Sequence, residues 1–242
     1  MLKFVANEKF IVFVNNKFKS YLPINHIFMK HPFTGHEKVR KKLITHYSIL
    51  SLSEYLVVLS PHQALWDEIT AIKKDFAEKY QCPFAYSTKP HVTLIKFAQR
   101  KMMEDRIRVQ LRNIINRNSP LKIELKDYGS FPTHTIYINV TTKVPIVHLV
   151  KDLKEAQRLM KPDEENKPFF ITEPHLTIAR KLLHWQYEKA WLAYSHSFFT
   201  GRFVADHILM LRRTAGEKKY TLVERFELLG QASAEVRQGI LF

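Results

Sequence analysis

Apolar residues at helical spacing mark the clearest element of the chain. They recur every three or four positions between residues 61 and 80, with polar residues between them: Leu65, Ile69, Ile72, Phe76 and Tyr80. Ser60 precedes the segment as a predicted N-cap, Pro61 suits the first helical position, and Gln63 completes a capping box with Ser60. We therefore predict an amphipathic helix over residues 61–80 that packs on a sheet.

Short apolar and alternating runs predict a set of strands around that helix. The predicted strands cover residues 10–14, 55–59, 90–97, 121–125, 135–140, 174–179, 203–211 and 220–229. Further helices are predicted at 103–115, 145–160 and 184–195, and turns at 129–132 and 214–217. Similar elements recur in the two halves of the chain, which indicates an α+β protein with an internal pseudo-repeat.

Composition and charge narrow the class of partner. The 242 residues are 45% hydrophobic and 25% charged, which is typical of a globular protein with a sizeable core. The formal net charge of +15 favours polyanionic partners such as nucleic acid or nucleotides. Much of this charge lies on helical segments such as residues 101–117, where a solvated basic face explains it equally well.

Cysteine content and hydropathy bear on the compartment. Cys82 is the single cysteine, so an internal disulfide and a multi-cysteine zinc site are both excluded. No apolar run approaches the roughly 18–20 residues that span a bilayer. We expect a cytoplasmic protein that is a monomer and does not bind membranes.

Two copies of one short pattern carry the candidate chemistry. Residues 90–95 read Pro-His-Val-Thr-Leu-Ile, and residues 174–179 read Pro-His-Leu-Thr-Ile-Ala. On a strand, residues i and i+2 point to the same face, so His91 lies beside Thr93 and His175 beside Thr177. A single His-x-Thr is a weak signal, but two copies at matching places in two similar halves predict a shared site.

Two imidazoles and two hydroxyls suit phosphate ester chemistry. The ordinary pKa of imidazole, near 6.5, lets one histidine act as base while the other acts as acid. The threonine hydroxyls can donate hydrogen bonds to the phosphate oxygens. As a hypothesis, His175 is the base that activates water and His91 the acid that protonates the leaving ribose oxygen, with the reverse assignment open.

The residues of this pattern resemble the two-histidine (2H) phosphoesterase superfamily, whose hallmark is a pair of His-x-Thr/Ser motifs. Within it, the chain is similar to the bacterial and archaeal RNA 2′,3′-cyclic phosphodiesterases, also called 2′-5′ RNA ligases. The likeness spans residues 54–229 and includes the Phe131-Pro132 turn and the Ala179-Arg180 that ends the second motif. The chain departs from that branch at Ile95-Lys96-Phe97 and in the last hairpin, at residues 211–214.

This resemblance implies a bilobal, pseudo-symmetric α+β fold in which two antiparallel-rich sheets line a central cleft with helices outside. It implies an N-terminal extension at residues 1–53, a catalytic domain at 54–230 with lobes of about 54–140 and 141–230, and a tail at 231–242. The implied activity is metal-independent and cofactor-independent hydrolysis of 2′,3′-cyclic phosphates on RNA ends or nucleotides to 2′-phosphates. A reversible 2′-5′ RNA ligase activity would run the same machinery backwards. The implied catalytic residues are His91, Thr93, His175 and Thr177.

Three further residues are candidate substrate contacts. Lys96 and Arg180 each follow their histidine by five positions, so on a regular strand they emerge on the opposite face, as solvated cations. A strand end or a bulge would turn either side chain back toward the site. Phe131 is a candidate to stack on a base, with core packing as its alternative role.

Two other classes of function stay open. The chain could be an RNA-binding or nucleotide-binding module with weak or lost catalysis, because that class uses the same basic charge. A metallohydrolase is the third interpretation, although the other ten histidines show no metal-ligand spacing such as His-x-x-x-His.

Overall fold

The computed structural model describes the backbone of residues 3–7, 10–15, 18–23 and 52–231, and side chains from residue 52 to 231. The chain forms two compact units, residues 1–47 and 48–242. The described part of the first unit is an antiparallel sheet of β1 (Lys3–Asn7), β2 (Phe10–Asn15) and β3 (Phe18–Pro23). The strand predicted at residues 10–14 is thus confirmed. Most of the predicted tail, residues 232–242, lies outside the described residues.

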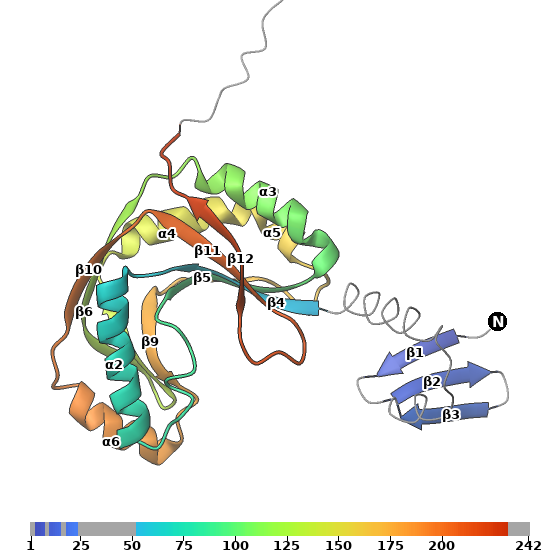
Figure 1. The fold of residues 1–242 in the computed structure, drawn as a ribbon, viewed down its shortest axis with the longest axis horizontal. Coiled ribbons are helices and arrows are strands. Elements are labelled where there is room, and N and C mark those ends of the chain that lie inside the picture. The colour runs from blue at the N-terminus through green and yellow to red at the C-terminus, as the bar shows by residue number, and fades with distance from the viewer. Residues whose placement is uncertain (1–2, 8–9, 16–17, 24–51, 232–242) are drawn as a thin grey trace, which may run out of the picture. The chain divides into compact units, whose positions relative to one another are not determined.

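The second unit is an α+β structure built on one curved sheet (Figure 1). Its strands are β4 (Leu52–Leu59), β5 (Val92–Arg100), β6 (Leu121–Phe131), β7 (Thr135–Val140), β8 (Phe169–Phe170), β9 (His175–Arg180), β10 (Thr200–Ala205), β11 (His207–Arg213) and β12 (Thr221–Glu227). Its helices are α2 (Gln63–Lys79), α3 (Glu104–Ile115), α4 (Lys143–Leu153), α5 (Gln157–Met160) and α6 (His184–Tyr194), with 3-10 turns at Lys101–Met103 and Lys154–Ala156. The predicted α+β class is confirmed.

Antiparallel pairing orders the sheet as β10-β6-β7-β9-β5-β4-β11-β12, with β8 added beside β5. The two expected sheets are joined, because β5 and β9 pair at Val92 and Leu176. Each half of the sheet takes strands from both halves of the sequence: β6 and β7 lie with β9 and β10, and β4 and β5 lie with β11 and β12. The sequence halves therefore do not coincide with the halves of the sheet.

Helices cover one face of each half of the sheet. Helices α2 and α6 contact the β10-β6-β7-β9 half, whereas α3, α4 and α5 contact the β5-β4-β11-β12 half (Figure 1). Alternation along the strands explains this, since Tyr55, Val57 and Leu59 of β4 are fully buried on the helix side. The polar residues of the strands are left for the opposite face.

Four predicted element boundaries were wrong. Helix α2 begins at Gln63 because His62 is extended and caps the helix: its Nδ1 accepts a hydrogen bond from the Leu65 N–H. Ser60, the expected cap, instead donates a hydrogen bond from its hydroxyl to the Pro61 carbonyl. The turn expected at 129–132 falls at 132–134, because β6 continues through Phe131. The strand expected at 203–211 is two strands divided at Asp206, because β10 pairs with β6 whereas β11 pairs with β4 and β12. The helix expected at 145–160 is α4, a 3-10 turn and α5.

Candidate active site

The two His-x-Thr motifs lie side by side where β5 meets β9. Val92 pairs with Leu176, and both side chains are fully buried on the helix side. One residue further along this antiparallel register, His91 lies opposite Thr177 and Thr93 lies opposite His175. These four side chains are partly exposed on the other face of the sheet, which we call the motif face. The structure therefore brings together all four residues that the sequence singled out as catalytic.

Both imidazoles are held in the same way. The Nδ1–H of His91 donates to the Lys89 carbonyl at 2.7 Å, and the Nδ1–H of His175 donates to the Glu173 carbonyl at 2.8 Å. A carbonyl only accepts, so Nδ1 carries the hydrogen in each ring. Nε2 is then the atom left to give or take a proton.

A β-bulge follows each motif at the same position. The register skips Leu94 on β5 and Ile178 on β9, each the third residue after its histidine. The extra residue reverses the alternation, so Lys96 pairs with Leu56 and Arg180 with Thr135, both in line with the motif face. Of the two outcomes that the sequence left open for these cations, the structure shows the bulged one: both are exposed on the side of the histidines.

Burial and positive charge act together on His91. Burial lowers its pKa most, the hydrogen bond to the Lys89 carbonyl raises it, and the charges of Lys73, Arg180 and His175 lower it further, to about 4. His91 is therefore neutral near pH 7. The influence of His175 on this pKa also agrees with the closeness of the two imidazoles.

Aromatic rings hold His175 from the side. Phe131 and Tyr137 each lie with the ring centroid 5.0 Å from that of the imidazole, and 4.6 Å from each other. Tyr137 pairs with Gly129 on β6, where a Cβ would come within 2.5 Å of the Tyr137 ring. Phe131 thus packs on a motif residue, partly exposed, rather than in the core, and its contact with a base stays a prediction.

Lys73 is the site residue that the sequence reasoning missed. It is 2% exposed on α2, and its Nζ donates to the Thr88 carbonyl at 2.7 Å and reaches the Thr177 carbonyl at 3.5 Å. A signal for it exists in the sequence: Lys73 is four residues after Ile69 and three before Phe76, on the apolar face of the predicted helix.

Both arginines of the last hairpin form ion pairs with glutamates. Arg212 bonds to Glu104 at 2.7 Å, and Arg213 pairs with Glu54 and stacks on the Tyr220 ring, 4.8 Å from its centroid. Glu54 also accepts a hydrogen bond from the Tyr220 hydroxyl at 2.8 Å. This part of the chain, where the sequence departs from the related branch, is thus fixed by ion pairs.

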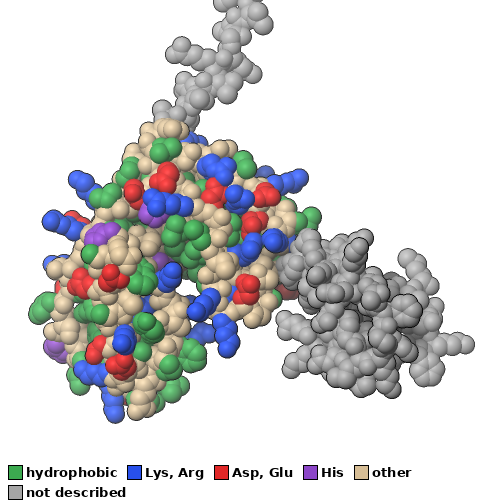
Figure 2. Space-filling model, in the orientation of Figure 1, with side chains coloured by type: hydrophobic (Ala, Val, Ile, Leu, Met, Phe, Trp, Pro, Cys, Tyr) green, Lys and Arg blue, Asp and Glu red, His purple; other side chains and the backbone are tan. Residues whose placement is uncertain are grey.

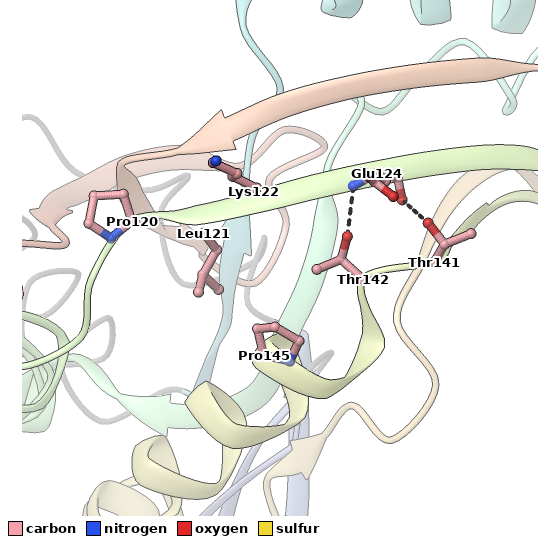
Figure 3. A pocket seen from close by; sticks show the side chains of 7 residues that line it. All are labelled: Pro120, Leu121, Lys122, Glu124, Thr141, Thr142 and Pro145. Carbon is pink, nitrogen blue, oxygen red and sulfur yellow. Dashed lines mark hydrogen bonds between the residues drawn. The ribbon is translucent and has the colours of Figure 1, made fainter.

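Basic side chains surround the concave side of the sheet. Figure 2 shows the surface hollowed there, with Lys and Arg gathered around the hollow. Two depressions elsewhere in the surface contain no motif residue. The one in Figure 3 lies where β6 begins beside α4, and the Thr142 hydroxyl there accepts a hydrogen bond from the Glu124 N–H at 2.9 Å.

Within the described residues, no group of three or more His, Cys, Asp or Glu is arranged to hold a metal ion. Nor does any helix of that part have the length and apolar character to cross a membrane.

Comparison with known proteins gives one family and one fold. The model of the 2′-5′ RNA ligase superfamily matches residues 61–217. The crystal structure of E. coli LigT in apo form is similar with a TM-score of 0.51 and 14% identity, covering 73% of this chain and 98% of that one. The structure of E. coli LigT complexed with 3′-AMP is similar with a TM-score of 0.51 and 15% identity, covering 74% and 99%. No curated protein matches the chain.

Proposed function

The chain belongs to the 2′-5′ RNA ligase superfamily, and from this premise we propose that it is a metal-independent phosphodiesterase that opens 2′,3′-cyclic phosphates. Its substrates are RNA ends or nucleotides, and its product carries a 2′-phosphate. One observation carries the proposal: the Val92–Leu176 pair sets two imidazoles and two threonine hydroxyls on one face of the sheet. A solved E. coli LigT structure holds 3′-AMP, which supports a nucleotide as the ligand.

In the proposed reaction, one imidazole Nε2 takes a proton from water as the water oxygen attacks phosphorus. The bond from phosphorus to the ribose 3′ oxygen breaks, and the second imidazole gives its Nε2 proton to that oxygen. Thr93 and Thr177 donate hydrogen bonds to the non-bridging oxygens, where negative charge builds up. Ligation takes these steps in the same direction, with an RNA 5′-hydroxyl in the place of water, and the reverse of that reaction cleaves the 2′-5′ linkage back to the cyclic phosphate.

We assign His91 as the base, the alternative that the sequence left open, because it enters the reaction without a proton on Nε2. Its pKa of about 4 keeps it neutral in the free enzyme near pH 7, with the Nε2 lone pair available because Nδ1–H is held by the Lys89 carbonyl. His175 is then the acid. Before the anionic substrate binds, the positive groups beside His91 favour its neutral form over its protonated form.

An aryl phosphodiester separates the two roles. p-Nitrophenolate leaves without protonation, so His175→Ala should keep most of its activity on a p-nitrophenyl diester while losing it on a cyclic nucleotide. His91→Ala should lose both activities. The opposite pattern would return His91 to the role of acid.

Cations and one aromatic ring complete the proposed site. Lys96 and Arg180 offset the phosphate charge from the motif face, and the Phe131 ring beside His175 stacks on a base. The proposed setting is the cytoplasm, with which the single cysteine, the buried Cys82, agrees, and the proposed oligomeric state is a monomer.

The deciding assay follows hydrolysis of 2′,3′-cyclic AMP in EDTA. Wild-type protein should form the 2′-phosphate, identified by 31P NMR, whereas His91→Ala and His175→Ala should not; His148→Ala, on exposed α4 surface, is the control. Absence of turnover on any cyclic or 2′-5′-linked substrate, with binding retained, would favour the RNA-binding module. Turnover abolished by EDTA would favour a metallohydrolase.

A further inference from the structure

Lys73 is a buried cation that the proposed reaction does not use. It lies on the buried face of α2 with Leu65, Ile69 and Phe76, and only 2% of its surface is exposed. Removing an ammonium group from water costs several kcal/mol unless partners compensate it. Within residues 52–231 the partners of Nζ are neutral oxygens, so the cost is only partly offset. Because the desolvation cost of the Lys73 ammonium group is only partly offset, we expect this charge to have a function.

The partners of Lys73 are Thr88, just before the first motif, and Thr177 of the second motif. Nζ donates to the Thr88 carbonyl at 2.7 Å and to the Thr88 hydroxyl at 3.0 Å, and its longest contact is the Thr177 carbonyl at 3.5 Å. Three acceptors match the three hydrogens of an ammonium group. Thr88 directly precedes Lys89, whose carbonyl holds Nδ1 of His91. One ammonium thus connects the segment that orients His91 to the strand that carries Thr177.

On the basis of the proposed function, we propose that Lys73 is a positioning residue: it fastens the two motifs together and holds His91 in its neutral, Nδ1–H form. Its hydrogen bonds hold Thr88 and thereby place the next carbonyl along the chain, that of Lys89, which selects the tautomer. Its charge opposes a proton on the imidazole.

The charges around His91 agree with this role. Lys73 of α2 and Arg180 and His175 of β9 all lower the His91 pKa, and the Lys89 carbonyl alone raises it. Burial, and then the Arg180 charge, lower the pKa of Lys73 itself to about 8. Lys73 is therefore charged near pH 7, and its deprotonation should shift the His91 NMR resonances near pH 8.

NMR of the full chain with 15N-labelled histidine tests this directly, with His91 identified from a His91→Gln spectrum. Lys73→Met removes charge and donors, Lys73→Gln removes the charge and keeps donors, and Lys74→Met is the control on the exposed side of α2. In both Lys73 variants the His91 titration should move to higher pH. In Lys73→Met, His91 should also become a mixture of tautomers. In wild type, a second shift of the His91 resonances near pH 8 should be present, and it should vanish in Lys73→Gln.

The proposal would be overturned if His91 had the same titration and the same tautomer in both Lys73 variants as in Lys74→Met. The absence of a step near pH 8 in wild type, which needs no variant to fold, would also overturn it. If wild type hydrolyses cyclic phosphate, kcat/KM should fall roughly 10- to 100-fold in Lys73→Met and stay within about twofold in Lys74→Met. If wild type has no turnover, the proposed function fails, whereas the NMR titration still decides the role of Lys73.

Discussion

Val92 of β5 pairs with Leu176 of β9, and this pair sets the register of the two His-x-Thr motifs. Each histidine thereby lies opposite the threonine of the other motif. The bulges at Leu94 and Ile178 repeat this correspondence on the two strands and turn Lys96 and Arg180 to the same face. The site is therefore built from two equivalent strand segments that meet at equivalent positions, with one cation on each strand.

Stability should fall as the pH drops below 6.5, in part through His91. Its folded pKa of about 4 lies below the ordinary value of 6.5, so the unfolded chain binds a proton in this interval that the folded chain does not. This contribution is present above pH 6.5 and is lost as the pH falls to about 4. Its size is on the order of 3 kcal/mol.

Urea unfolding at several pH values, followed by tryptophan fluorescence, measures this effect. Trp66, Trp185 and Trp191 all belong to the second unit, so the signal reports on the unit that holds the site. His91→Gln should lose less stability between pH 6.5 and 4 than wild type, and His148→Gln should behave like wild type. Equal pH dependence in wild type and His91→Gln would contradict the account.

Gly129→Ala should impair the site through Tyr137. The new Cβ would come within 2.5 Å of the Tyr137 ring and 2.6 Å of the Asn139 amide oxygen, which forces the ring from its place against His175. We expect a loss of about 1–3 kcal/mol in stability and roughly tenfold in kcat/KM. Gly201→Ala is the matched control, since its Cβ would meet Leu65 at 2.9 Å in the core. A control that loses as much activity as Gly129→Ala would show a general packing effect instead.

Removal of either cation on the motif face should weaken substrate binding. We expect Lys96→Gln and Arg180→Gln to raise KM for a cyclic nucleotide roughly three- to tenfold, because each substitution removes a positive side chain that attracts the anionic substrate. The effect should shrink at high salt. Lys151→Gln, on the exposed side of α4, should leave KM unchanged. An unchanged KM in both site variants would return these cations to the role of solvated side chains.

The placement of the four motif residues on one face was predictable because their signal is local. The i, i+2 spacing of His91 with Thr93 and of His175 with Thr177 fixes a shared face on any strand, and the repeat suggested that the two would meet. The bulges were not predictable, because Leu94 and Ile178 are ordinary apolar strand residues without a glycine to mark an extra position. Local pattern alone therefore left both faces open for Lys96 and Arg180, and the bulges select the motif face.

Long-range pairing limited the rest of the fold prediction. The apolar run at 203–211 reads as one strand, yet its parts join opposite halves of the sheet on either side of Asp206. Lys73 lies on the apolar face of the predicted helix, but its partners Thr88 and Thr177 are 15 and 104 residues away along the chain. The order of strands across the sheet depends on such contacts, which a local pattern does not contain.

The central claim is that His91 and His175 act as one unit on one phosphodiester. A double-mutant cycle on 2′,3′-cyclic AMP measures this: kcat/KM is determined for wild type, His91→Ala, His175→Ala and the double variant, all in EDTA. Each single variant should lose about 100- to 10,000-fold, and the double variant should be no more than about tenfold worse than either single one. Losses that multiply in the double variant, or a single variant within tenfold of wild type, would contradict the account.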